Sequence, residues 1–171
     1  MEKPRALCIE SVSLTTVLSV FRRVPPAHYQ KLRQVLTEMD EQGIIRKSMN
    51  EYASPLVMVW KKNGDLRICT DFRWLNRRTI RDAHPLPHQS DCLAALGGNA
   101  VFSTMDLTSG FYNLSLHEED KKYTAFTTPL GLPEYNRMPQ GLCNSLASFM
   151  RMTKLQQSLV LLRLPLDFCP Q

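Results

Sequence analysis

The chain has 171 residues, of which 43% are hydrophobic and 22% charged, enough for one compact core or for two small subdomains sharing a cleft. Residues 1–81 contain 15 Lys and Arg against 8 Asp and Glu, whereas residues 82–171 contain 6 against 8, so a net charge of +7 precedes one of −2. This imbalance suits a protein that holds a polyanion, although a solvated basic surface explains it equally well. Five widely spaced cysteines indicate free thiols in a reducing compartment. Because no apolar run approaches the roughly 18 residues of a membrane span, and no signal peptide is evident, we expect a soluble intracellular protein without a membrane partner.

The first element with a clear sequence signal is a helix. Residues 1–21 are apolar and β-branched without a clear period, and we assign them no structure. Two prolines then precede apolar residues at helical spacing from Tyr29 to Met39, and Gly43 follows them. This pattern predicts an amphipathic helix of about four turns.

Residues 56–61 and 66–70 form two short strand-like runs around an Asn-Gly pair, which is a strong signal for a tight hairpin. Lys62 near the tip and Arg67 on the return strand can reach one phosphate-sized target, the lysine as a mobile charge and the arginine as a planar fork. Taken alone, a basic hairpin of this kind is more often an ordinary solvated turn. The following arginines, Arg73 among them, can track a nucleic-acid backbone.

The stretch at 100–117, AVFSTMDLTSGFYNLSLH, is expected to place a carboxylate at a strand end. A short helix is predicted over 90–96, and a strand over 101–105 then delivers Asp106. Gly110 is expected to allow a tight backbone turn before Phe111. Asp106 taken alone is more typical of a helix cap or a turn former than of a functional site.

The remaining elements are a charged surface turn, a strand pair and a long helix. Residues 117–122 have mixed charge, and 123–128 and 133–138 are expected to pair as strands around a Leu-Gly turn. A Pro-Gln-Gly turn then opens a helix of roughly four turns, whose start favours anions. Gln140 in this turn offers both an amide donor and an acceptor to a bound substrate.

Five successive blocks of the sequence, in their order and spacing, resemble the reverse transcriptase domain of gypsy-type LTR retrotransposons and their retroviral relatives. The blocks are PPAHYQKLRQVLTEMDEQGIIRKS, YASPLVMVWKKNGDLRICTDFRWLN, HPLP, LGGNAVFSTMDLTSGFYNLSLHEEDKKYTAF and MPQGLCNSLASF. The resemblance implies an α+β fold, the fingers and partial palm of a right-hand polymerase, with an antiparallel sheet backed by helices. It also implies boundaries: an unassigned segment 1–21, a reverse transcriptase part 22–153 with fingers at about 22–96 and palm at about 97–153, and a divergent tail 154–171.

The resemblance further implies roles for residues of the palm. Asp106 matches the first catalytic aspartate, which is a metal ligand. Phe111 matches the aromatic gate under the nucleotide sugar, whose ring collides with a ribose 2′-hydroxyl. Gln140 and Gly141 match the turn that contacts the nucleotide sugar and the template base pair.

In the fingers, the resemblance implies that Lys62 and Arg67 bind the triphosphate of a dNTP and that Arg73 contacts the template. The implied partners are an RNA or DNA template-primer and a dNTP. The family reaction is template-directed deoxynucleotidyl transfer with two Mg²⁺ ions, which need several hard oxygen ligands.

The second metal-binding motif of the family, a Tyr-x-Asp-Asp hairpin, is not found in this sequence. It is expected about thirty residues beyond the Pro-Gln-Gly turn, but no Asp-Asp pair occurs anywhere in the 171 residues. The sequence also departs from the family at Leu146, where proline is usual, and at Met150, where glutamine is usual. We therefore expect a truncated domain, separated from the connection, RNase H, integrase and protease regions of a parent polyprotein.

Two functional hypotheses follow. The chain is part of an RNA-directed DNA polymerase, or it is a catalytically inactive remnant that at most binds nucleic acid or dNTP. The free thiols and the family together predict a cytoplasmic location with access to the nucleus.

Overall fold

The computed structural model describes residues 23–62, 64–85 and 109–161, together with positions 88, 90, 94, 97, 98 and 107, and it describes side chains of the last helix as far as residue 153. Residues 1–21, the strand predicted at 101–105, Asp106 and most of the helix predicted at 90–96 lie outside this part of the chain.

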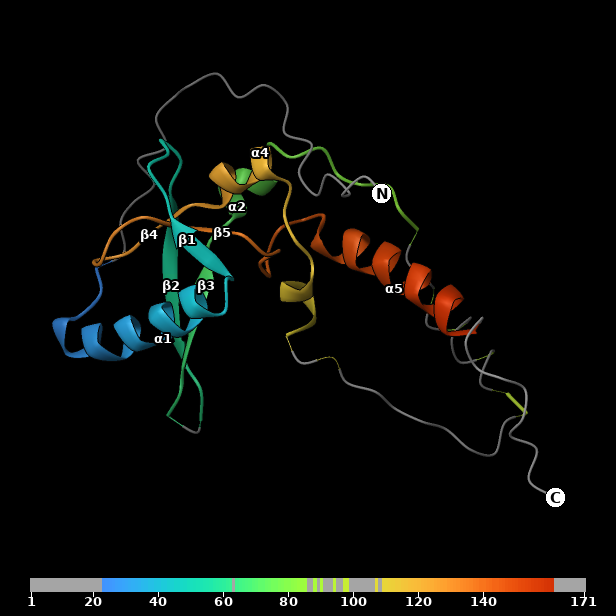
Figure 1. Cartoon of the computed structure of the whole chain (residues 1–171), viewed down its shortest axis with the longest axis horizontal. Coiled ribbons are helices and arrows are strands. Elements are labelled where there is room, and N and C mark those ends of the chain that lie inside the picture. Colours follow the sequence, from blue (N-terminus) through green and yellow to red (C-terminus); the bar gives the residue numbers. More distant parts are fainter. Residues whose placement is uncertain are drawn as a thin grey trace.

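The helix predicted after the two prolines is confirmed. A 3₁₀ turn, η1 (Pro26–His28), leads into α1 (Tyr29–Glu41), and Gly43 follows with φ +66°. A positive φ is readily adopted only by glycine, so the helix stops where the sequence indicates. Leu32 is fully buried, and α1 packs against the first and third strands (Figure 1).

The predicted hairpin is also confirmed. Strand β2 (Ser54–Trp60) pairs antiparallel with β3 (Leu66–Thr70), from Leu56 opposite Thr70 to Trp60 opposite Leu66. The tip of the hairpin projects from the body of the molecule below α1 in Figure 1. Gly64, with φ +84°, supplies the left-handed conformation that the tight turn requires.

The strand pairing predicted for 123–128 and 133–138 is wrong. Strand β4 (Phe126–Thr127) pairs parallel with β2, whereas β5 (Pro133–Tyr135) pairs antiparallel with β1 (Ile45–Lys47). A bridge joins Thr128 to Gly131 in the intervening turn, and the Tyr135 N–H donates a hydrogen bond of 3.0 Å to Oγ1 of Thr124. The two segments do not pair as strands with each other, because the strand within each one satisfies its backbone hydrogen bonds with a different distant strand.

Short helical turns and one long helix complete the described fold. They are α2 (Arg73–Asn76), η2 (Gly110–Asn113), α4 (Glu118–Lys121), η3 (Lys122–Thr124) and α5 (Ser145–Leu161). The charged segment predicted as a surface turn forms α4 and η3, and its Asp120 is buried. Helix α5 begins five residues after Gln140, so a turn separates that residue from the helix.

The core joins both sheets and α1 in one apolar cluster. Phe72, Phe126 and Tyr135, all at most 2% exposed, are the largest side chains within it. The α+β class is confirmed, and the parallel pairing of β2 with β4 is the one departure from an antiparallel arrangement among the described strands. Within the described residues, no helix combines the length and apolarity needed to cross a membrane.

Candidate functional site

A cavity of about 390 Å³ lies between α1, β3, η2 and the turn that follows β5. This volume is within the range of about 300–1,000 Å³ typical of small-molecule sites. The cavity is lined by Val35, Met39, Lys61, Leu66, Arg67, Ile68, Cys69, Thr70, Ser109, Phe111, Tyr112, Tyr135 and Gln140.

Three of the residues selected from the sequence line this cavity together. Arg67 comes from β3, Phe111 from η2 and Gln140 from the turn before α5. Arg67 donates a hydrogen bond from Nη2 to Oε1 of Gln140, across 73 positions of sequence. The guanidinium is otherwise exposed at the cavity wall, so its remaining N–H groups are available to an anionic ligand.

The backbone turns before Phe111 at a different residue from the one expected. Ser109, not Gly110, has the left-handed conformation, with φ 52°. A Cβ at Gly110 would lie 3.2 Å from Cε2 of Phe149, so the glycine is needed for close approach to α5. The Phe149 ring in turn lies 5.2 Å from that of Phe111, centroid to centroid, and supports it from the side.

The floor of the cavity is neutral. Tyr112 stacks on Tyr135 with ring centroids 6.4 Å apart, and the Tyr135 hydroxyl lies 3.1 Å from Oγ1 of Thr70. Burial raises the pKa of both tyrosines above the ordinary value of 10, so neither phenol ionises near neutral pH. An anionic ligand would therefore face the Arg67 guanidinium without a phenolate opposing it.

Two hydrogen bonds fix the backbone of the turn that carries Gln140. Gly141 has φ +100°, and its carbonyl oxygen accepts a hydrogen bond of 2.7 Å from Nδ2 of Asn76. On the other side of Gln140, the Pro139 carbonyl accepts a hydrogen bond of 3.0 Å from the Ser145 hydroxyl. The backbone on both sides of Gln140 is thus tied to neighbouring structure.

Lys62 and Arg73 lie outside the cavity lining. Lys62 is exposed in the hairpin turn, where the adjacent Lys61 lines the cavity instead. The Arg73 side chain is 76% exposed and pairs with Asp71, with Nη2 2.7 Å from Oδ2. This hydrogen bond raises the pKa of the Arg73 guanidinium, which remains a cation on the surface.

The described residues do not fit a two-metal centre. No group of three or more His, Cys, Asp and Glu side chains in this part of the chain converges on a point where a cation could bind. Asp106, the one ligand expected from the sequence, lies outside the described residues. The described residues therefore contain no candidate for the two-metal centre that the resemblance implies.

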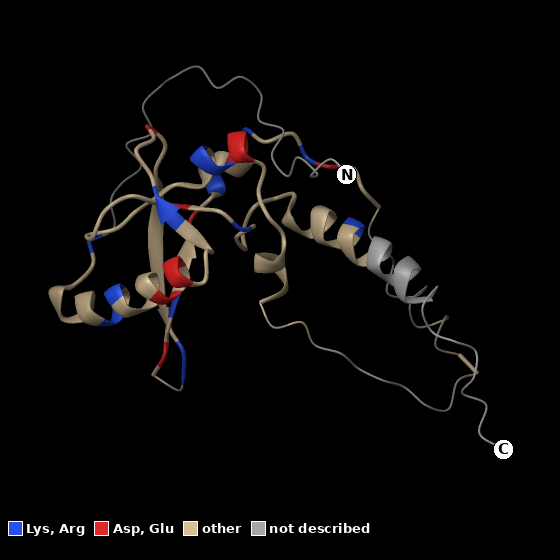
Figure 2. Cartoon of the chain, in the orientation of Figure 1, with Lys and Arg blue, Asp and Glu red and all other residues tan. Residues whose placement is uncertain are grey.

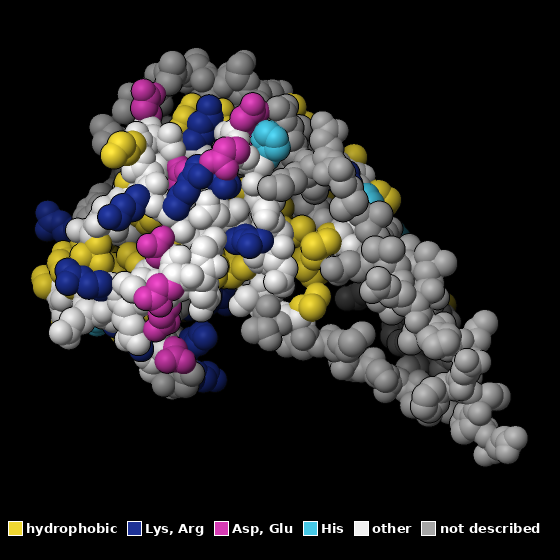
Figure 3. Space-filling view, in the orientation of Figure 1, with side chains coloured by type: hydrophobic (Ala, Val, Ile, Leu, Met, Phe, Trp, Pro, Cys, Tyr) yellow, Lys and Arg dark blue, Asp and Glu magenta, His cyan; other side chains and the backbone are white. Residues whose placement is uncertain are grey.

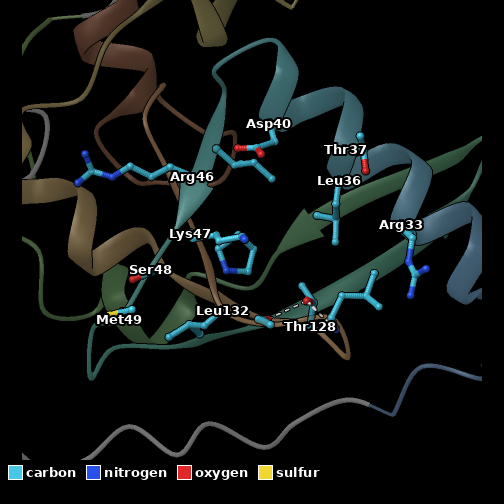
Figure 4. A pocket seen from close by; sticks show the side chains of 14 residues that line it. Arg33, Leu36, Thr37, Asp40, Arg46, Lys47, Ser48, Met49, Thr128 and Leu132 are labelled. Carbon is cyan, nitrogen blue, oxygen red and sulfur yellow. Dashed lines mark hydrogen bonds between the residues drawn. The ribbon is translucent and has the colours of Figure 1, made fainter.

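A second cavity, of about 480 Å³, lies between α1, β1 and the Thr128–Gly131 turn (Figure 4). Leu36 points from α1 toward the turn, and Arg33, Asp40 and Lys47 surround the space. None of the residues selected from the sequence lines it, and the four charged residues of its lining have both signs. It is therefore a weaker candidate than the cavity beside Arg67.

Basic and acidic residues are interspersed over the described fold. Figure 2 shows Lys and Arg on α1, β1, α2 and the hairpin, with acidic segments close by. The face drawn in Figure 3 likewise alternates positive and negative side chains. The excess positive charge of residues 1–81 is thus spread over several elements in these views.

Several cavity residues have no distinguishing sequence signal. Tyr135 comes from a strand whose pairing was predicted wrongly, and Cys69 is one of five scattered cysteines, of which Cys69 and Cys143 are free thiols in the structure. Asn76, which bonds to Gly141 from outside the cavity lining, has no sequence feature that separates it from other polar residues at helix ends. Other lining residues are adjacent in sequence to selected ones: Lys61 to Lys62, Leu66 and Ile68 to Arg67, and Tyr112 to Phe111.

Residues 59–161 match a family model described as reverse transcriptase (RNA-dependent DNA polymerase). The retrovirus-related Pol polyprotein from transposon opus of Drosophila melanogaster is 42% identical over 127 residues, which cover 71% of this chain and 13% of the relative. The Pol polyprotein from transposon 297 of the same organism is 40% identical over 129 residues, or 72% and 12% of the two chains. The enzymatic polyprotein of figwort mosaic virus is 32% identical over 149 residues, or 82% and 22%. The chain thus spans a small part of the length of these relatives.

Solved structures of foamy virus protease-reverse transcriptase have the same fold. The prototype foamy virus enzyme matches with a TM-score of 0.71 at 25% identity, over 80% of this chain and 19% of that one. The foamy viral enzyme in complex with an RNA/DNA hybrid matches with a TM-score of 0.73 at 22% identity, over 91% and 21%. These similarities identify the described fold as that of reverse transcriptase fingers and palm.

Proposed function

The chain belongs to the reverse transcriptase (RNA-dependent DNA polymerase) family, and from this premise we propose that it binds a template-primer and an incoming dNTP as part of a retrotransposon Pol polyprotein. The proposed site is the cavity of about 390 Å³ beside β3. The observation that carries the proposal is the convergence of Arg67, Phe111 and Gln140, from three distant segments, on this one cavity.

Each proposed contact follows from the chemistry of the side chain. Arg67 binds triphosphate oxygens through its planar fork, and Lys62 adds a mobile charge from the hairpin turn. Phe111 lies under the deoxyribose and excludes a 2′-hydroxyl by its bulk. Gln140 and the backbone of Gly141 contact the sugar and the base pair, because a glycine allows close approach of the main chain.

Nucleic acid is proposed to bind along the basic residues that follow the hairpin. Arg73 is exposed and directed onto Asp71, so its position is fixed while part of its guanidinium remains open to solvent. We propose the fingers at residues 22–96 and the palm at 97–153. In support, the foamy viral enzyme of the same fold has been solved with an RNA/DNA hybrid.

A second candidate function is binding without catalysis. The sequence contains no Asp-Asp pair, and a two-metal centre needs several carboxylates, of which Asp106 is the only one that we propose here. In this alternative the chain holds nucleic acid or dNTP but does not transfer a nucleotide.

The nucleotide site can be tested by displacement of a labelled dTTP from the chain loaded with poly(rA)·oligo(dT) in Mg²⁺. Arg67→Ala is expected to weaken dTTP binding by at least about tenfold, because a charge-assisted hydrogen bond is lost. Arg33→Ala removes the same charge at the other cavity and serves as the matched control. Equal affinity of the Arg67→Ala and Arg33→Ala variants would contradict the proposed site.

The same assay tests the sugar gate. In the unmodified chain dTTP should displace the label better than ribothymidine triphosphate, and Phe111→Ala should reduce this preference. If the preference is unchanged in Phe111→Ala, the ring is not the gate.

A further inference from the structure

The side-chain amide of Asn76 uses both of its ends on one turn. Its Nδ2 donates to the Gly141 carbonyl at 2.7 Å, and its Oδ1 accepts from the Cys143 backbone N–H at 2.9 Å. A carboxamide offers an N–H donor and a C=O acceptor side by side at the same tip. The pair of bonds therefore fixes the backbone of residues 141–143 relative to α2.

Asn76 is itself rigidly connected to Arg67. It is the last residue of α2, and its backbone N–H bonds to the Phe72 carbonyl at 2.8 Å. Helix α2 starts three residues after the end of β3, the strand that carries Arg67. Phe72, between the two elements, is 2% exposed and anchors this connection in the core.

These contacts close a ring around the candidate site. The ring runs from Arg67 along β3 and α2 to Asn76, across to Gly141, and back through Gln140 to the Arg67 guanidinium. Gly141 has φ +100° and no side chain, so its backbone would otherwise have wide conformational freedom. The bond from Asn76 removes this freedom at the residue next to Gln140.

The far end of the turn has its own anchor. Asn144 accepts from the Asp82 backbone N–H at 3.0 Å and donates to the Ile80 carbonyl at 2.9 Å. It is buried and three residues farther from Gln140 than Gly141 is, so it secures the start of α5. Beside the cavity, the Ser145 hydroxyl bonds to the Pro139 carbonyl before Gln140, and Asn76 bonds to the Gly141 carbonyl after it.

We infer that Asn76 is a positioning residue for nucleotide binding: it holds the Gly141–Cys143 backbone so that the Gln140 amide faces Arg67 and the bound dNTP. This inference rests on the proposed function of the site. It assigns to Asn76 an effect on dNTP affinity that passes through Gln140 and the Gly141 backbone rather than through direct contact.

The geometry can be tested without any ligand, by amide hydrogen exchange of the 171-residue chain. Asn76→Ala removes the acceptor of the Cys143 N–H and should accelerate its exchange by about tenfold. Asn76→Asp keeps an oxygen acceptor and should leave the Cys143 N–H protected, although it loses the donor to Gly141. Unchanged Cys143 exchange in Asn76→Ala would overturn the inference.

The effect on binding can be tested with labelled dTTP on the chain loaded with poly(rA)·oligo(dT) in Mg²⁺. Asn76→Asp and Asn76→Ala should each weaken dTTP binding about three- to tenfold and leave template-primer affinity unchanged. The double variant Asn76→Ala/Gln140→Ala should lose less affinity than the sum of the two single losses, because part of the effect of Asn76 passes through Gln140.

Thr79→Val is the matched control for a loss of stability alone. Thr79 is buried and donates from Oγ1 to the Leu75 carbonyl at 2.9 Å, so its removal weakens the same region without touching the turn. It should lower the melting temperature and leave dTTP affinity intact.

Equal loss of dTTP affinity in Thr79→Val, or additive effects of Asn76→Ala and Gln140→Ala, would overturn the inference. If the unmodified chain binds no dTTP, the proposed function itself fails, whereas normal binding in both Asn76 variants defeats only the positioning role.

Discussion

An ion pair between Asp82 and Arg151 joins the segment after α2 to α5. Arg151 donates from both terminal nitrogens to the carboxylate, with Nη2 2.7 Å from Oδ1. The carboxylate also accepts from the His84 backbone N–H at 3.0 Å. The Arg151 hydrogen bond holds the pKa of Asp82 below its ordinary value of 3.8. A lowered pKa in the folded state means that this interaction stabilises the fold above pH 4 and is lost as pH falls below that value.

We therefore predict a pH-dependent cost for Asp82→Asn. Near pH 6 the variant should be less stable by about 0.5–1 kcal/mol, a small value because the Arg151 side chain is 42% exposed. The difference should shrink as pH falls below about 4, where the carboxylate of the unmodified chain becomes protonated. Urea unfolding at several pH values measures both. Asp40→Asn, on the exposed surface of α1, removes the same charge outside this pair and is the control. A difference that stays constant down to pH 2.5 would contradict the ion-pair explanation.

The ring of Phe111 also depends on a neighbour that the sequence did not indicate. Phe149 lies beside it, and the absence of a side chain at Gly110 leaves room for Phe149. The glycine was correctly expected to matter, but for the wrong reason. Its role here is close packing against α5, while Ser109 adopts the left-handed conformation. Backbone freedom and steric clearance are both met by glycine, so sequence alone does not separate them.

At the scale of elements, the β2–β3 hairpin depends on one backbone conformation. Gly64 has φ +84°, and a Cβ built on it would meet nothing within 4 Å. We predict that Gly64→Ala destabilises the fold by about 1 kcal/mol, because alanine is strained in the left-handed backbone conformation of this residue and meets no other obstacle. Gly64→Asn should cost less, because asparagine tolerates this conformation better than alanine does. Thermal or urea unfolding of the two variants checks the order, and an equal cost for both would point to a different cause.

The elements that were predicted correctly are those with local signals. Helix α1 has its prolines, its periodic apolar face and its terminal glycine, and the hairpin has Asn-Gly between two β-prone runs. Strands β4 and β5 were expected to pair with each other because they are adjacent in sequence. Their true partners lie about 70–90 positions away, and their two- and three-residue lengths give no pattern from which such partners can be inferred.

Only part of the candidate site was predictable from the sequence. Arg67, Phe111 and Gln140 were selected through the family resemblance, and the structure brings these three to one cavity. The roles assigned to them remain predictions, as do those of Lys62 and Arg73. Asn76 could not be selected, because its importance comes from two long-range hydrogen bonds that leave no trace in composition or spacing.

At the scale of the whole molecule, the net charge of +5 predicts salt-sensitive binding to a template-primer. The slope of log affinity against log salt should fall by about two to three when Lys62, Arg67 and Arg73 are all changed to Ala. The control triple variant, with Arg23, Arg33 and Lys47 changed to Ala, removes three exposed charges elsewhere and should change the slope less. Filter binding between 50 and 300 mM salt gives both slopes. Identical slopes for the two triple variants would mean that Lys62, Arg67 and Arg73 do not form a localised binding surface for the template-primer.

The last prediction concerns catalysis by these 171 residues. Nucleotidyl transfer by the family mechanism needs carboxylates that hold two Mg²⁺ ions near the primer terminus, and the sequence offers Asp106 without an Asp-Asp pair. We therefore expect no extension of oligo(dT) on poly(rA) with dTTP and Mg²⁺, even where the chain binds both substrates. Binding of dTTP, measured in the same preparation, shows that a negative result is not caused by unfolding. Conversely, template-directed extension that Asp106→Asn abolishes would establish that the chain assembles a working metal centre from other ligands, and would exclude the binding-only alternative.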